Sequence, residues 1–146
     1  MDRRNFLVIA IFSFGFLAIL IVLKLKRKII RKSINKKNIT RKWKNLMLNL
    51  TDDKKWAQAI LDADSLVDEV LKKKRYGGKT MGERLVSAQR DLTKNDAVWF
   101  AHKFSNKLTT SKDSKVKKDD VVTVLNNYKS ALIDLNALEV KPKGKK

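Results

Sequence analysis

WAQAILDADSLVDEVL, at residues 56–71, repeats apolar side chains at the spacing of one face of an α-helix. Thr51 and the two aspartates after it suit the helix start, because a hydroxyl cap and first-turn acids satisfy free amides and favour the helix dipole. Gly77 and Gly78 are expected to end the helix, since glycine tolerates the left-handed conformation found there. The predicted inner face consists of Trp56, Ala59, Ile60, Ala63, Leu66, Val67, Val70 and Leu71.

The same helical spacing recurs on both sides of this segment, and no stretch shows the sustained alternation of a strand. One short helix is predicted from Thr40 to about Leu50. Downstream helices are predicted from Thr80 to about Leu92, where Thr80 and Glu83 form a capping box, and then over residues 95–108 and 119–138. Short loops between such helices are typical of a bundle. The sequence therefore predicts an all-α fold with a four- to five-helix bundle at residues 40–138.

Residues 6–23 read FLVIAIFSFGFLAILIVL and carry no charge over eighteen positions. A helix rises about 1.5 Å per residue, so this run would span roughly 27 Å, close to the ~30 Å hydrocarbon core of a bilayer. A cleaved signal peptide is the main alternative, but its apolar region usually ends in small residues, whereas this one ends in Leu23 and Lys24. We therefore predict an uncleaved single-pass membrane anchor at residues 1–23.

The net charge of +19 is unevenly distributed along the chain. Residues 24–44 hold eleven Lys or Arg and no acid, whereas residues 45–140 hold seventeen basic and fourteen acidic residues, a balance of only +3. Cytoplasmic flanks of membrane helices retain Lys and Arg, and only Arg3 and Arg4 precede the apolar run. This asymmetry predicts a cell-membrane protein with its N-terminus outside and its C-terminal domain in the cytoplasm. Residues 139–146 are predicted to be a basic disordered tail.

The basic juxtamembrane segment, residues 24–39, is a candidate for contact with anionic lipid headgroups. It could instead act only as a retention signal. Nucleic acid is less favoured as its partner, because isoleucines are interleaved with the basic residues where base-stacking aromatics would be expected. The candidate contact residues are Lys24, Lys26, Arg27, Lys28, Arg31, Lys32, Lys36 and Lys37.

No catalytic constellation, cofactor site or metal site is predicted. Cysteine is absent, and His102 is the only histidine. We interpret His102 as a half-buried residue on its helix, because no Ser, Cys or paired acid marks a partner for it. Asp64 and Asp68 share a helix face at i and i+4, and we interpret them as part of a solvated face that offsets nearby lysines.

Several spaced blocks together resemble a bacterial family of HEPN-like helical domains, some of which look membrane-anchored in the same way. The likeness covers about Thr40 to Leu138. The blocks that carry it are Trp56-Ala57-Gln58-Ala59-Ile60-Leu61-Asp62-Ala63-Asp64, Gly78-Lys79-Thr80-Met81-Gly82-Glu83-Arg84-Leu85, Trp99-Phe100-Ala101-His102-Lys103 with Asn106, and Tyr128 with Leu132.

The resemblance implies where a ribonuclease motif would lie. Active HEPN domains are typically metal-independent ribonucleases with an Arg, a polar residue and a His, brought together across a dimer. Here Asn106 matches the polar residue, but Ser105 stands at the Arg position and Thr110 at the His position. His102 precedes the motif and is not its equivalent. The resemblance thus implies a catalytically degenerate copy that is not an enzyme.

Three functional hypotheses follow from the sequence. The leading one is a membrane-tethered, noncatalytic module that binds a protein partner or a second copy of itself at the cytoplasmic face. The alternative is RNA or nucleotide binding, or residual ribonuclease activity, assisted by the basic run 72–75 with Lys103 and Lys107. The third is a membrane organiser that acts only through anionic lipid.

Overall fold

The computed structural model describes residues 15–22, 34–110 and 115–139 and divides the chain into two units, Met1–Lys32 and Ser33–Lys146. In the first unit, residues 15–22 are helical and exposed. Most of the predicted anchor lies outside the described residues, as do the tail 140–146 and the candidate lipid contacts Lys24, Lys26, Arg27, Lys28, Arg31 and Lys32. Within the described ranges, no helix has the length and apolar character needed to cross a bilayer. The anchor and its orientation stay predictions.

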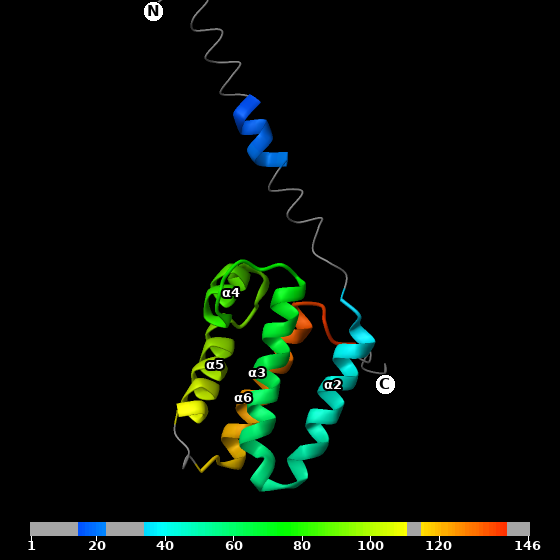
Figure 1. The fold of residues 1–146 in the computed structure, drawn as a ribbon, viewed down its shortest axis with the longest axis vertical. Helices are drawn as coiled ribbons and strands as arrows, with labels where there is room; N and C mark the ends of the chain where they lie inside the picture. Colours follow the sequence, from blue (N-terminus) through cyan, green and yellow to red (C-terminus); the bar gives the residue numbers. More distant parts are fainter. Residues whose placement is uncertain (1–14, 23–33, 111–114, 140–146) are drawn as a thin grey trace, which may run out of the picture. The chain divides into compact units, whose positions relative to one another are not determined.

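The second unit is a bundle of α-helices, and every described element in it is helical (Figure 1). Short 3-10 turns lie between α2 and α3 and after α4. The all-α prediction and the helical bundle are confirmed. The helices are α2 (Lys36–Leu48), α3 (Trp56–Lys73), α4 (Met81–Ala88), α5 (Asn95–Thr110) and α6 (Lys118–Asp134).

α3 is the central helix of this bundle, because it packs against α2, α4, α5 and α6. Its apolar face is fully buried at Ile60, Val67, Val70 and Leu71. The rest of the core comes from the surrounding helices, and all of it lies between Ile39 and Leu138. The second unit therefore contains a complete core of its own, and the fragment 33–146 can be studied separately.

α2 begins at Lys36, four residues before the predicted start at Thr40. The Asn35 side chain caps the helix by accepting a hydrogen bond from the Asn38 amide, and Ile39 is fully buried. Residues 36–39 were assigned to the juxtamembrane segment because of their charge, yet Ile39 continues the apolar face of α2 by a full turn. Lys36 and Lys37 consequently belong to the bundle.

The end of α3 differs from the prediction in the residue that adopts the left-handed conformation. That residue is Arg75, with φ 60°, and the Tyr76 amide donates to the Leu71 carbonyl at 3.1 Å to close the last turn. Gly78 does not end the helix but allows the close turn of the loop that follows it. Its φ of 140° lets the chain turn back so closely that an added Cβ would lie 2.6 Å from Glu83 Cβ.

Candidate functional site

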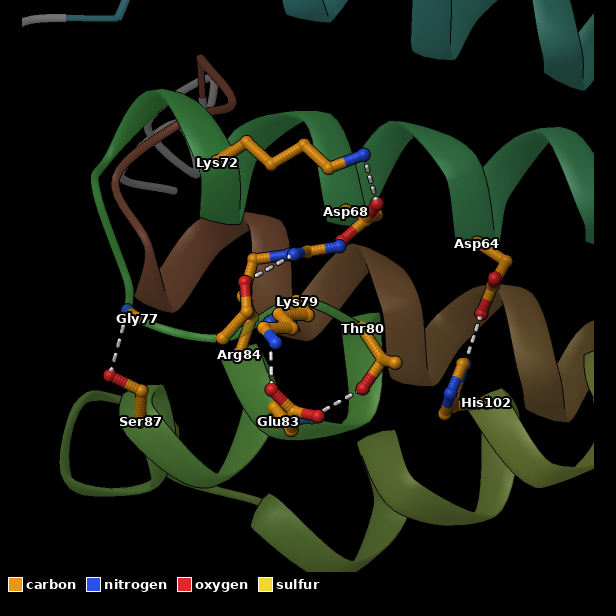
Figure 2. A network of polar contacts seen from close by, with 11 residues as sticks. Asp64, Asp68, Lys72, Gly77, Lys79, Thr80, Glu83, Arg84, Ser87 and His102 are labelled. Carbon is orange, nitrogen blue, oxygen red and sulfur yellow. Dashed lines mark hydrogen bonds and ion pairs between the residues drawn. The ribbon is translucent and has the colours of Figure 1, made fainter.

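Two carboxylates on α3, Asp64 and Asp68, form polar contacts that join helices of the bundle. Their side chains are only 19% and 16% exposed. They share one helix face as predicted, and Asp68 offsets Lys72 as predicted, but the face is not simply solvated, because each carboxylate also bonds to a side chain on another helix (Figure 2). We call this set of contacts the α3 seam.

Asp64 joins three helices. Its Oδ1 accepts a hydrogen bond from the Tyr128 hydroxyl on α6 and lies 2.9 Å from Nδ1 of His102 on α5. His102 Nε2 lies 3.3 Å from the Asn106 side-chain nitrogen. A proton on Nδ1 satisfies both contacts, since Nδ1 then donates to Asp64 and Nε2 accepts from Asn106.

The Tyr128 hydroxyl is held as a donor. Burial and the neighbouring Asp64 charge raise the pKa of Tyr128 far above its usual range, so the phenol stays protonated at physiological pH. Ser105 Oγ lies 2.8 Å from this hydroxyl and donates to the Ala101 carbonyl at 3.2 Å. The buried hydroxyl groups of Ser105 and Tyr128 therefore both have hydrogen-bond partners within the core.

The interpretation of His102 as a residue without an acidic partner is also wrong. Its partner is Asp64, 38 residues earlier in the chain, and His102 is only 9% exposed. One sequence signal could have shown that Asp64 needs a partner, though not which residue it is. Asp64 falls between Ile60 and Val67 in the apolar repeat, and an acid within a buried stripe requires a hydrogen-bonding partner.

Asp68 fixes α4 to α3 through Arg84, which is only 5% exposed. Arg84 Nε donates to Asp68 Oδ1 at 2.7 Å, and its Nη1 donates to the Gly78 carbonyl at 2.8 Å. Lys72 Nζ completes the site at 2.7 Å from Asp68 Oδ2. The guanidinium group thereby holds the loop before α4 and α4 itself against α3 (Figure 2).

The predicted capping box at the start of α4 is confirmed. The Thr80 hydroxyl accepts from the Glu83 amide at 3.2 Å, and Glu83 Oε2 accepts from the Lys79 amide at 2.7 Å. The Gly77 amide, a few residues earlier, donates to Ser87 Oγ at 3.1 Å. The loop 77–80 is therefore bonded to α4 at several points.

The three positions of the degenerate motif do not form one site. Ser105 is 1% exposed and belongs to the core, whereas Asn106 is exposed and contacts His102. The exposed Thr110 directs its hydroxyl to the Lys107 carbonyl of its own helix at 3.0 Å. The structure therefore brings the side chains of His102 and Asn106 together, whereas the Thr110 hydroxyl contacts only backbone carbonyls, those of Lys107 and Asn106. Over the described ranges, no three His, Cys, Asp or Glu residues gather into a possible metal site.

A groove of about 370 Å³ lies elsewhere, between α2 and α3. Charges of both signs line it, and two of them, Lys42 and Glu69, already pair with each other at 2.7 Å. None of the residues that line the groove belongs to the α3 seam. The groove offers no access to His102 or Asn106.

No known protein family, curated protein or solved structure was found to match this chain. The HEPN-like resemblance accordingly stays a prediction. What the geometry itself offers is a set of buried polar contacts that join helices, with the Asn106 amide as their exposed end.

The Asp68 site predicts a specific dependence of stability on pH. Burial alone would raise the pKa of Asp68, but the hydrogen bonds and charges of Arg84 and Lys72 outweigh it and lower that pKa. A carboxylate with a lowered folded-state pKa stabilises the fold above its unfolded-state pKa of about 3.9, and this stability is lost as pH falls through the folded-state pKa. We expect Asp68→Asn to reduce the loss of unfolding free energy on acidification below about pH 4.

Urea denaturation of the fragment 33–146 at a series of pH values would measure this difference. Glu69 also has a lowered pKa, because Lys42 and Lys73 outweigh its burial, so part of the acid dependence will remain in the variant. Superimposable pH profiles for Asp68→Asn and the unmodified fragment would show that the Arg84 contact does not depend on the charge of Asp68.

Proposed function

We propose that this chain is a membrane-tethered, noncatalytic helical interaction module, and that its bundle binds a protein partner or a second copy of itself at the cytoplasmic face. The observation that carries the proposal is the exposed aromatic side chain of Phe100 on α5. Phe100 is 49% exposed, and its ring lies 6.2 Å from that of Phe104. The tether rests on the apolar run 6–23 and the basic residues after it.

The outer face of α5 has the composition of a contact surface. Phe104 is partly buried and packs against the core, whereas Phe100 is exposed. The two rings therefore form one aromatic surface that extends from the core to solvent. Lys103 and Lys107 are exposed on the same helix. Aromatic side chains surrounded by polar residues are enriched at protein interfaces and supply much of the binding energy there.

A noncatalytic role is supported by the surroundings of the motif positions. A ribonuclease needs a cation for the phosphodiester and a group that transfers a proton. Ser105 offers neither and is bonded within the core, and the Thr110 hydroxyl bonds to its own helix. His102 directs one ring nitrogen at Asp64 and the other at Asn106. We therefore favour binding over RNA cleavage, as a degenerate HEPN-like ancestry would imply.

Replacing Phe100 by Glu is expected to weaken self-association or partner capture by about 30-fold, because interface hot spots contribute 2 kcal/mol or more. Sedimentation equilibrium of the fragment 33–146 would measure self-association, and crosslinking of the full chain in membranes would measure partner capture. Val86→Glu is the matched control, since Val86 is 54% exposed but lies on α4.

The proposal fails if the unmodified fragment is strictly monomeric and the full chain crosslinks to no protein. Equal losses for Phe100→Glu and Val86→Glu would instead show that the loss is not specific to the outer face of α5. Both variants should unfold at the same urea concentration as the unmodified fragment, because the replaced side chains are largely exposed.

A further inference from the structure

Both ends of the described bundle meet at one place. Lys36 at the start of α2 donates to the Asn136 side chain at 2.6 Å, and the Glu139 amide donates to the Thr40 hydroxyl at 3.1 Å. The chain therefore enters and leaves the second unit at the same end. The segments that continue from this end carry only basic charge, six Lys or Arg within residues 24–32 and four Lys within residues 140–146.

The basic run at the end of α3 lies at this same end. α2 and α3 pack side by side and are joined by the short segment 49–55, so they run in opposite directions, with the 2.7 Å ion pair of Lys42 and Glu69 between them (Figure 1). Lys36 and Lys37 precede that pair on α2, and residues 72–75 follow it on α3, so both groups lie beyond the pair in the same direction (Figure 1). We call this surface the basic end. It consists of Lys36, Lys37, Lys72, Lys73, Lys74 and Arg75.

Four of the six basic residues are exposed, two of them while forming ion pairs, and Lys36 and Lys74 are half-buried. Lys72 pairs with Asp68 and is 61% exposed, while Lys73 pairs with Glu69 and is 44% exposed. Arg75 is exposed and sits in the left-handed turn that ends α3. Asp68 and Glu69 thus offset part of the charge, and Lys74 makes a contact of its own, but the six basic residues outnumber the acids Asp68, Glu69, Asp91 and Glu139 near this end.

We infer that the basic end is a docking surface for anionic phospholipid headgroups, which sets the orientation of the bundle on the membrane. The inference deepens the proposed function and rests on it for the tether. An anionic bilayer attracts clustered Lys and Arg, and the attraction accumulates with each charge near the surface.

Lipid fits this surface better than single-stranded nucleic acid does. Proteins that bind single strands combine basic residues with exposed aromatic side chains on which bases stack. No described residue of the basic end is aromatic. Tyr76, which follows Arg75, is only 8% exposed and bonds to Asp91 at 2.8 Å. A surface that offers Lys and Arg charges but no exposed aromatic ring is suited to binding the negative charges of phospholipid headgroups.

Flotation of the fragment 33–146 with phosphatidylcholine vesicles, with and without phosphatidylserine, tests the inference. The fragment should float only with phosphatidylserine, and less so as salt is added. Replacing all of residues 72–75 by Gln should weaken this binding about 10- to 100-fold, given four charges that are partly offset by their neighbours. The matched control, Lys54, Lys55, Lys117 and Lys118 changed to Gln at the opposite end, should change binding less than about threefold.

Two further measurements keep the result unambiguous. Urea denaturation of each variant reports whether it folds, and Lys72, Lys73 and Lys74 changed to Arg should keep the binding because the charge is kept. Labelled single-stranded RNA is the competing ligand.

The inference is overturned if the fragment does not float at low salt, if both sets of Gln replacements weaken binding equally, or if RNA binds more tightly than the vesicles. The flotation experiment uses a fragment without the predicted anchor and with Phe100 unchanged. None of these outcomes therefore bears on the proposed α5 contact, which is tested separately by Phe100→Glu.

Discussion

Replacing Asp64 by Ala is expected to lower the free energy of unfolding by about 2 to 4 kcal/mol, because it leaves two hydrogen-bond donors without their acceptor at about 1 to 3 kcal/mol each. The change deprives the Tyr128 hydroxyl and His102 Nδ1 of the same acceptor. Tyr128 is fully buried whereas Asp64 is 19% exposed, so water that enters the vacated space recovers only part of the lost hydrogen bonding. Urea denaturation of the fragment 33–146 would measure the loss.

Asp62→Ala is the matched control for this prediction. Asp62 lies on the same helix but is exposed, and it accepts a hydrogen bond from Gln58 at 2.8 Å. Its removal should change the unfolding free energy by no more than about 0.5 kcal/mol. A double-mutant cycle with Tyr128→Phe would isolate the Asp64–Tyr128 contact, and a coupling energy near zero would contradict its stabilising role.

Gly78→Ala is the second large effect, with an expected loss of about 2 to 4 kcal/mol from backbone strain and steric overlap. A Cβ at this position would lie 2.6 Å from Glu83 Cβ and 2.8 Å from the Arg84 amide nitrogen, and φ is 140°. The loop has to shift to relieve the overlap. Because the Gly78 carbonyl accepts from Arg84, this shift also removes a hydrogen bond from a buried guanidinium.

The neighbouring glycine provides the control. A Cβ on Gly77 would meet nothing closer than Ser87 Oγ at 3.9 Å, an ordinary contact. Gly77→Ala should therefore be close to neutral, because alanine also reduces the freedom of the unfolded chain. Equal unfolding midpoints for Gly77→Ala and Gly78→Ala would mean that the close approach at Gly78 is absent in solution.

The helices could be predicted because their information is local. The apolar repeat of residues 56–71 and the Thr80 capping box each lie within one element, and the structure contains both. The start of α2 was missed because Lys36 and Lys37 were assigned by charge, although Ile39 continues the apolar spacing through Trp43. Charge shows which surfaces are solvated, but it does not mark where a helix begins.

The α3 seam was missed because its contacts are distant in sequence. Asp64 meets His102 on α5 and Tyr128 on α6, and no local repeat predicts which helices lie side by side. The i, i+4 spacing of Asp64 and Asp68 gave their common face correctly. Whether that face meets water or another helix depends on the packing of the bundle, and only the tertiary structure shows it.

The central place of α3 also governs when the bundle can form during synthesis. Tyr128 follows Asp64 by 64 residues, an interval of about 3 to 13 seconds at ribosomal rates of 5–20 residues per second. Throughout this interval α3 lacks its longest-range partner, and part of its apolar face has nothing to cover it. The nascent chain is therefore a natural client for chaperones, and the hydrophobic N-terminal segment emerges from the ribosome well before the bundle can fold.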